Sequence, residues 1–220
     1  MNAYPTDTES DVKETGRVEA FSDGVIAIAI TLLVLEIRVP HLEEGQRLAD
    51  GLWDIWPAYL AYIISFFTIG IMWINHHRLF HLIKRVDDVF LGLNTLLLMM
   101  ITFVNFPTSL LADHLDNPDE RRTAALVYSG TFVVTAIAFN GLWRYASHHN
   151  RLIDRKTDLT QVNAITQQYN YGPLMYLAAF LAAFISVPLS LAINFGLALF
   201  FALPGRAKKG GETLNKKGDS

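Results

Sequence analysis

Four long stretches of this sequence contain no charged side chain, and they limit what the chain can fold into more than any other feature. The stretches are residues 55–75, 89–112, 123–143 and 171–203. A helix of about 20 apolar residues spans a bilayer, and about 18 in a row is the usual criterion for a transmembrane helix. The sequence therefore predicts a polytopic membrane protein. It excludes a water-soluble enzyme or a nucleic-acid-binding domain as the main interpretation.

Composition supports this class and removes several chemistries. Only 18% of the 220 residues are charged, against roughly 25% in soluble domains. The formal net charge of -3 argues against a nucleic-acid partner, because nucleic-acid binders present basic faces. The chain has no cysteine, which excludes disulfides, zinc–thiolate sites and iron–sulfur clusters. We expect no enzymatic activity, no cofactor and no resident metal ion.

A fifth apolar stretch, residues 18–37, is unusually short for a membrane span. Its uncharged centre, residues 24–35, would form a helix of roughly 18 Å, whereas the hydrocarbon core is about 30 Å thick. Asp23 and Glu36 flank this centre, so they lie within or at the edge of the membrane zone. Ionisable groups there normally face protein or water. Either this helix lines a wet pathway, or its ends are packed inside the protein.

The last stretch, residues 171–203, is too long for one span. It would form roughly 50 Å of helix, and Ser186, Pro188 and Ser190 lie near its middle. Because proline removes a backbone donor and breaks helices, we predict a hairpin of two short helices. This gives an all-α fold with six transmembrane helices. One kinked helix, and five spans in total, is the alternative.

The distribution of Lys and Arg favours six spans. With six, fourteen of the 18 cationic side chains fall on one side of the membrane, whereas five spans divide them equally. Because cytoplasmic loops carry the Lys and Arg excess, both termini are predicted to be cytoplasmic. We expect a disordered cytoplasmic tail over residues 1–16, a six-helix domain over 17–204 and a basic cytoplasmic tail over 205–220.

The first predicted helix combines small, apolar and hydroxyl side chains on one face. At about 100° per residue, that face holds Gly24, Ile28, Thr31, Leu32 and Leu35. One interpretation is a packed helix whose Thr31 hydroxyl bonds its own backbone. The other is a pore-lining helix whose Ile and Leu rings form a hydrophobic constriction that gates by dewetting.

Two motifs resemble the transmembrane protein 175 family, which comprises the lysosomal potassium channel and its bacterial homologues. The first is the run RVEAFSDG at residues 17–24 with the Ile-rich helix that follows it. The second is the run WINHH at residues 73–77, at the end of the second predicted span. The resemblance extends from residue 17 to about residue 203, and the chain length is similar to that of prokaryotic members with one six-helix unit.

The resemblance implies a homotetrameric channel of the bacterial plasma membrane, with the first helix of each copy around a central pore. By their position after the Phe-Ser-Asp motif, the family's pore constrictions map to Ile28, to Thr31 or Leu32, and to Leu35. The expected partners are other copies of the chain, the lipid bilayer and permeating K⁺ and other monovalent cations. No carbonyl filter loop of the Thr-Val-Gly-Tyr-Gly type is present, so we expect modest selectivity for K⁺ over Na⁺.

The motif residues are expected to hold helices together, because a buried charge needs a partner. Arg17 and Asp23 are six residues apart and point about 120° away from each other on a helix. Each is therefore predicted to bond a neighbouring helix. The predicted inter-helix network consists of Arg17, Phe21, Ser22, Asp23, Trp73, Asn75, His76 and His77.

Other polar residues in the spans carry further predictions. Asn94, Asn105 and Asn140 are candidate helix-bridging amides, and Asn105 with Pro107 predicts a kink in the third span.

His76, His77 and His81 have a spacing found in membrane di-iron oxygenases, but no adequate second histidine box accompanies them. We therefore interpret them as interfacial histidines, which could make channel opening sensitive to pH.

A proton-coupled secondary transporter that uses Asp23 and Glu36 is the main functional alternative. Transporters often contain inverted repeats and helices broken at matching positions. In this sequence only the last stretch is broken, and no convincing internal repeat is present. A non-conducting bundle that scaffolds a partner is a second alternative, which the short first helix disfavours.

Overall fold

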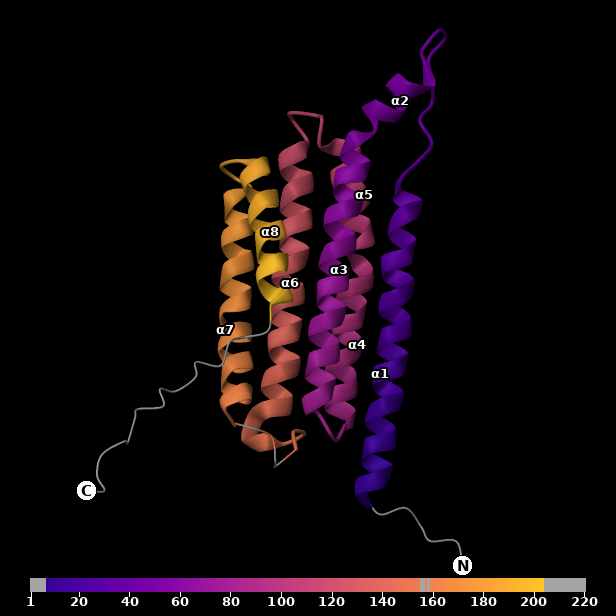
Figure 1. The fold of residues 1–220 in the computed structure, drawn as a ribbon. Coiled ribbons are helices and arrows are strands. Elements are labelled where there is room, and N and C mark those ends of the chain that lie inside the picture. Colours follow the sequence, from indigo (N-terminus) through magenta and orange to yellow (C-terminus); the bar gives the residue numbers. More distant parts are fainter. Residues whose placement is uncertain (1–6, 155–156, 158, 204–220) are drawn as a thin grey trace, which may run out of the picture.

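The computed structural model describes residues 7–154, 157 and 159–203, and its named elements are all helices. They are α1 (Asp7–Leu32), η1 (Leu33–Glu36), α2 (Leu48–Asp54), α3 (Trp56–Leu82), α4 (Asp88–Phe103), α5 (Asn105–His114), α6 (Arg121–Ser147), η2 (His148–Asn150), α7 (Leu159–Ala182) and α8 (Val187–Ala202). The predicted all-α fold is confirmed. Figure 1 shows the long helices side by side, with α1 at one edge of the bundle and α7 at the other.

Four helical segments are long and apolar enough to cross a membrane. They are Glu14–Glu36, Trp56–Leu82, Asp88–His114 and Arg121–Asn150. These segments support a membrane protein, as the uncharged stretches predict. Among the described residues, α8 is a shorter apolar helix, so the count of six spans stays a prediction.

The last uncharged stretch folds as the predicted hairpin. α7 ends at Ala182 and α8 begins at Val187, with Pro188 in the first turn of α8. The Ser186 hydroxyl accepts a hydrogen bond from the Leu189 N–H and so caps α8. The hairpin is therefore confirmed, but α7 starts at Leu159, upstream of the uncharged stretch.

The third span is interrupted at the place where the sequence predicts a kink. α4 ends at Phe103 and α5 begins at Asn105, with Pro107 in the first turn of α5. Proline cannot donate a backbone hydrogen bond to the preceding turn, which breaks the regular helical ladder here.

The structure describes part of the predicted N-terminal tail but none of the predicted C-terminal tail. α1 begins at Asp7, so residues 7–16 of the predicted tail lie within this helix, and the boundary of the tail stays a prediction. The predicted basic tail over residues 205–220 lies outside the described residues. The cytoplasmic location of both ends stays a prediction.

Hydrogen bonds between helices contribute to the packing of the bundle, since lipid supplies no hydrophobic driving force between apolar helices. Ser129 Oγ on α6 lies 2.9 Å from Ser190 Oγ on α8. Asn140 Nδ2 on α6 donates to the Tyr169 carbonyl of α7 at 2.7 Å, which confirms its predicted bridging role. Asn105 Nδ2 instead donates to the nearby Thr102 carbonyl, so it bridges no helices in this way.

A carboxylate joins three elements at the end of the bundle where α3 leads into α4. Asp87 accepts hydrogen bonds from the Phe90 N–H (2.9 Å) and the Tyr145 hydroxyl (2.8 Å). Arg151 Nε lies 3.3 Å from Asp87 Oδ2. Partial burial raises the pKa of Asp87, but these hydrogen bonds and the Arg151 charge outweigh it, so the pKa lies below its ordinary value of 3.8.

Candidate pore helix and its supporting network

One face of α1 packs against the rest of the chain. Ser22, Ile26, Ala29 and the adjoining Leu33 are at most 2% exposed. Their spacing of three or four residues places them on one helical face, and α1 contacts α3 and α4. The anchoring surface of the helix is therefore the face opposite the predicted pore stripe.

The predicted pore stripe faces away from the chain's own bundle. Ile28, Leu32 and Leu35 are 60%, 45% and 69% exposed, and Gly24 and Thr31 are exposed as well. α1 also lies at the edge of the bundle, where a neighbouring molecule can reach it (Figure 1). This face is available to lipid or to other copies of the chain.

The hydroxyl of Thr31 bonds its own helix. Thr31 Oγ1 donates to the carbonyl oxygens of Ala27 and Ile28, each at 2.9 Å. The backbone bond expected under the packed-helix interpretation is therefore present. Because the proton points toward the backbone, the lone pairs of the hydroxyl oxygen remain available to a cation on the exposed side.

Asp23 links α1 to α3 as predicted. Trp73 Nε1 donates to Asp23 Oδ1 at 2.9 Å. Arg17 and Phe21 are exposed, and no hydrogen bond or ion pair joins Arg17 to another described residue. Among the described residues of one copy of the chain, Arg17 therefore does not form the predicted bond to a neighbouring helix.

A buried chain of hydrogen bonds joins α1, α4 and α3. Asn94 Nδ2 on α4 donates to Ser22 Oγ on α1 at 2.9 Å, and Ser22 Oγ donates to the Val18 carbonyl at 2.8 Å. Asn94 Oδ1 lies 2.9 Å from His76 Nε2 on α3. Since the amide oxygen can only accept, His76 donates from Nε2, and its Nδ1 has no hydrogen-bond partner in the part of the chain that the structure describes.

A second row of polar side-chain contacts joins α1 and α3 nearby, closer to the start of α1. His77 Nδ1 is 2.9 Å from Glu19 Oε1, and His81 Nε2 is 3.1 Å from His77 Nε2. Glu19 was not among the predicted network residues, although it lies inside the RVEAFSDG motif, one helical turn before Asp23. That spacing is the signal that could have placed Glu19 on the same side of the helix as Asp23.

The histidine cluster is only partly interfacial. His76 is fully buried, so the interfacial interpretation is wrong for that residue, whereas His81 is exposed. Among the described residues, no group of three or more His, Cys, Asp or Glu side chains is placed to hold a metal ion.

Asn75 lies apart from the network that it was predicted to join. It is buried on α3 and lines a cavity of about 40 Å³ together with Thr68, Tyr169 and Tyr176. The cavity lies between α3, α6, α7 and α8, and not against α1. Of the eight predicted network residues, Ser22, Asp23, Trp73, His76 and His77 make the inter-helix contacts.

Comparisons with known proteins give one consistent result. Residues 17–104 match the family described as the endosomal/lysosomal potassium channel TMEM175. A potassium channel of Chamaesiphon minutus is 54% identical over 196 residues, which cover 88% of this chain and 96% of that protein. A potassium channel of Streptomyces collinus is 43% identical over 190 residues, which cover 86% and 92% of the two chains.

A solved structure and a vertebrate relative extend the comparison. The crystal structure described as a lysosomal potassium-selective channel TMEM175 homolog from Chamaesiphon minutus matches with a TM-score of 0.80 and 51% identity. The match covers 89% of this chain and all of that chain. The endosomal/lysosomal proton channel TMEM175 of Danio rerio is 26% identical over 201 residues, which cover only 37% of its length.

Proposed function

Because the chain belongs to the family of the endosomal/lysosomal potassium channel TMEM175, we propose that it is a potassium-permeable cation channel of a bacterial plasma membrane. Two bacterial relatives that it matches over most of their length are named potassium channels. The relative with a solved structure is described as potassium-selective. The four long apolar helical segments are consistent with a membrane channel.

The exposed stripe on α1 is the observation that carries the proposal. A single chain offers only one such helix, so a closed pore requires several copies. We propose a homotetramer in which the stripes of four α1 helices face a common axis, since identical subunits usually close into rings. The opposite face of each α1 is anchored on α3 and α4.

The stripe supplies two kinds of ring along the proposed pore. Ile28, Leu32 and Leu35 form apolar rings, which exclude water when the pore is narrow and so hold it closed. An ion in such a ring gives up its hydration without replacement. Thr31 contributes a ring of hydroxyl oxygens whose lone pairs can replace water around a dehydrated cation. Oxygens from side chains alone favour a modest preference for K⁺ over Na⁺.

The polar contacts of α1 position the pore helix. Asp23 bonds Trp73, and Ser22 bonds Asn94, so α3 and α4 fix both the rotation and the height of α1. We assign these residues a structural role in keeping the stripe turned toward the axis. Asp23 does not coordinate the permeating ion in this proposal.

The transporter alternative has less support. Asp23 and Glu36 are thirteen residues apart, a distance of about 20 Å along a helix. The intervening residues 24–35 contain no titratable side chain, so α1 itself offers no relay between the two carboxylates. A coupled carrier would need titratable groups at a common site near the membrane centre.

Flux through the purified full-length protein in liposomes tests the channel. We expect K⁺ to pass down a gradient in either direction without a second substrate, and bilayer recordings with K⁺ and Na⁺ on opposite sides to show a preference for K⁺. Leu35→Arg should abolish flux, because four cationic side chains would then face the pore. Val34→Arg is the matched control, since Val34 is also exposed but lies beside the stripe.

Three results would contradict the proposal. They are absence of flux in the wild-type protein, equal loss of flux in the two arginine variants, and saturable flux that requires a proton gradient. The last result would favour the transporter.

A further inference from the structure

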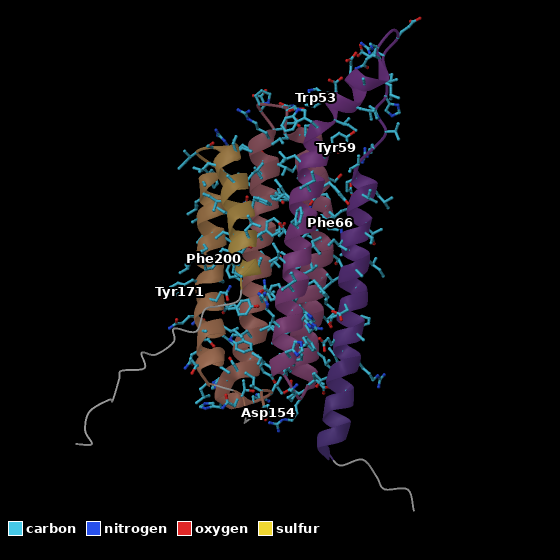
Figure 2. The ribbon with its side chains drawn as sticks, in the orientation of Figure 1. Trp53, Tyr59, Phe66, Asp154, Tyr171 and Phe200 are labelled. Atoms are coloured by element: carbon cyan, nitrogen blue, oxygen red, sulfur yellow. The ribbon has the colours of Figure 1, made fainter. Side chains whose placement is uncertain are left out.

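A cavity of about 720 Å³ lies at the end of the bundle where α6 passes into η2. Six of the residues that line it are Leu93 on α4, Gly141 and Arg144 on α6, His148 and His149 on η2, and Arg151. The same end of the molecule carries Asp154, which is labelled at the bottom of Figure 2, opposite Trp53. The cavity lies outside the pore stripe and the network that anchors α1.

The rim of this cavity is cationic. Arg144 donates from Nε and Nη2 to Asn170 Oδ1, at 3.1 and 2.9 Å. Asn170 is neutral, so these bonds orient the guanidinium without compensating its charge. Arg151 is paired with Asp87 at 3.3 Å and stacks 4.8 Å from the ring centre of Tyr145.

The histidines add further donors to the rim. The rings of His148 and His149 lie 4.2 Å apart between centroids, and each imidazole carries a ring N–H that can donate a hydrogen bond. Among the described residues no carboxylate forms an ion pair with Arg144, whereas Arg151 is paired with Asp87. The described rim therefore has an excess of positive charge and several N–H donors. Arginine and other charge-assisted donors of this kind recognise phosphate.

The floor of the cavity is apolar and open. Leu93 is half-buried, and a Cβ atom added at Gly141 would meet no atom within 4 Å. Gly141 lies about two turns before the end of α6, inside the candidate membrane span Arg121–Asn150. A cationic rim above an apolar floor at the end of a span matches a phospholipid, whose phosphate lies at the interface and whose chains lie below it.

We propose that this cavity binds the phosphate headgroup of an anionic phospholipid, with an acyl chain running along Leu93 and Gly141. Arg144, His148 and His149 bind the phosphate oxygens. The apolar floor distinguishes a lipid from a free phosphate ion, which would gain nothing from it. The proposal concerns binding and does not rest on the proposed conduction.

Lipid binding to the purified full-length protein in detergent tests the proposal. Native mass spectrometry would compare phosphatidylglycerol with phosphatidylcholine of the same acyl chains. We expect phosphatidylglycerol to bind more tightly, and Arg144→Gln to weaken its binding by about fivefold, the effect of removing one cation near an anionic headgroup. Gly141→Phe should weaken binding by filling the floor while every charge is kept.

Two variants at the same end of the bundle are matched controls. Lys84→Gln removes one exposed cation outside the cavity, and Gly92→Phe fills an equally open glycine position on α4. We expect neither to change phosphatidylglycerol binding. Size-exclusion profiles and melting curves identify variants that fail to fold. If Arg144→Gln is one of them, Gly141→Phe decides the question alone.

Three outcomes would overturn the proposal. Equal weakening by Lys84→Gln and Arg144→Gln would indicate nonspecific charge attraction. Equal binding of the two lipids would exclude a site for an anionic headgroup. Displacement of phosphatidylglycerol by glycerol 1-phosphate, with no effect of Gly141→Phe, would assign the site to a soluble phosphate compound.

Discussion

Replacement of Ile28 by asparagine tests the pore stripe most directly. Ile28 is 60% exposed in the single chain, so Ile28→Asn removes few packing contacts within the subunit. In the proposed tetramer it replaces an apolar ring by four amides, each of which can hold water or a cation. If the ring gains only about 1.4 kcal/mol of ion or water stabilisation, the rate of passage rises about tenfold. We therefore expect resting K⁺ flux to increase at least about tenfold, with nearly unchanged stability.

Ile26 provides the matched comparison on the opposite face of the same helix. It is 2% exposed, so Ile26→Asn would leave a cavity and bury an amide without a partner. These two effects together cost about 2–5 kcal/mol of unfolding free energy. The two substitutions are chemically identical and lie half a helical turn apart. Ile28→Asn is expected to change conduction, whereas Ile26→Asn is expected to change stability.

Liposome flux and thermal unfolding in detergent would measure the two properties on the same preparations. Each variant needs a check of its oligomeric state by size exclusion, because a tetramer that dissociates loses flux for a different reason. Unchanged flux in a stable, tetrameric Ile28→Asn variant would refute the gate assignment. Equal destabilisation by both variants would refute the two-faced description of α1.

Three further predictions concern the hydroxyl ring, the buried amide and the loop carboxylate. Thr31→Val keeps the side-chain shape but removes the oxygen, so the K⁺ to Na⁺ permeability ratio should fall about threefold in bi-ionic recordings, and an unchanged ratio would exclude a selectivity role. Asn94→Leu removes two hydrogen bonds and leaves both ring nitrogens of His76 without partners, so the unfolding free energy should fall by about 2–4 kcal/mol. The control variant Thr95→Val, on the exposed side of α4, should change the unfolding free energy little. Asp87 has a lowered pKa in the folded protein, so its contribution to stability is present above its ordinary pKa of 3.8 and is lost as the pH falls through the folded value. Asp87→Asn should therefore melt below the wild type at pH 7, and melting curves at decreasing pH should show the difference shrinking below pH 3.8; a constant difference would contradict this reasoning.

Periodicity and charge pattern predicted much of this fold. The face of α1 that holds Ile28 and Leu35 follows from the helical repeat alone, because burial of one face leaves the other exposed. The helix breaks near Pro188 and near Pro107 follow from the missing proline N–H. Each of these features depends on residues that are close together in the sequence, so it can be predicted without knowledge of tertiary contacts.

Tertiary contacts between polar side chains were harder to predict from the sequence. Asn94 was a candidate bridge, but only the packing of α4 between α1 and α3 brings it to both Ser22 and His76. Glu19 was missed because its partner His77 lies 58 residues away in the sequence. Asn75 shares the WINHH motif with His76 yet faces a different set of helices, since adjacent helical residues point about 100° apart.

The polar groups of α1 are divided between its two faces in a way that bears on assembly. Glu19, Ser22 and Asp23 all bond α3 or α4 within the subunit. On the exposed stripe, Thr31 is the one polar side chain, and its proton is donated to its own helix. Copies of the chain that meet along this stripe would therefore contact one another mainly through van der Waals packing of apolar side chains, which is one of the forces that associate helices in lipid. The surface suited to bringing α1 helices together is thus also the surface that would exclude water from the pore.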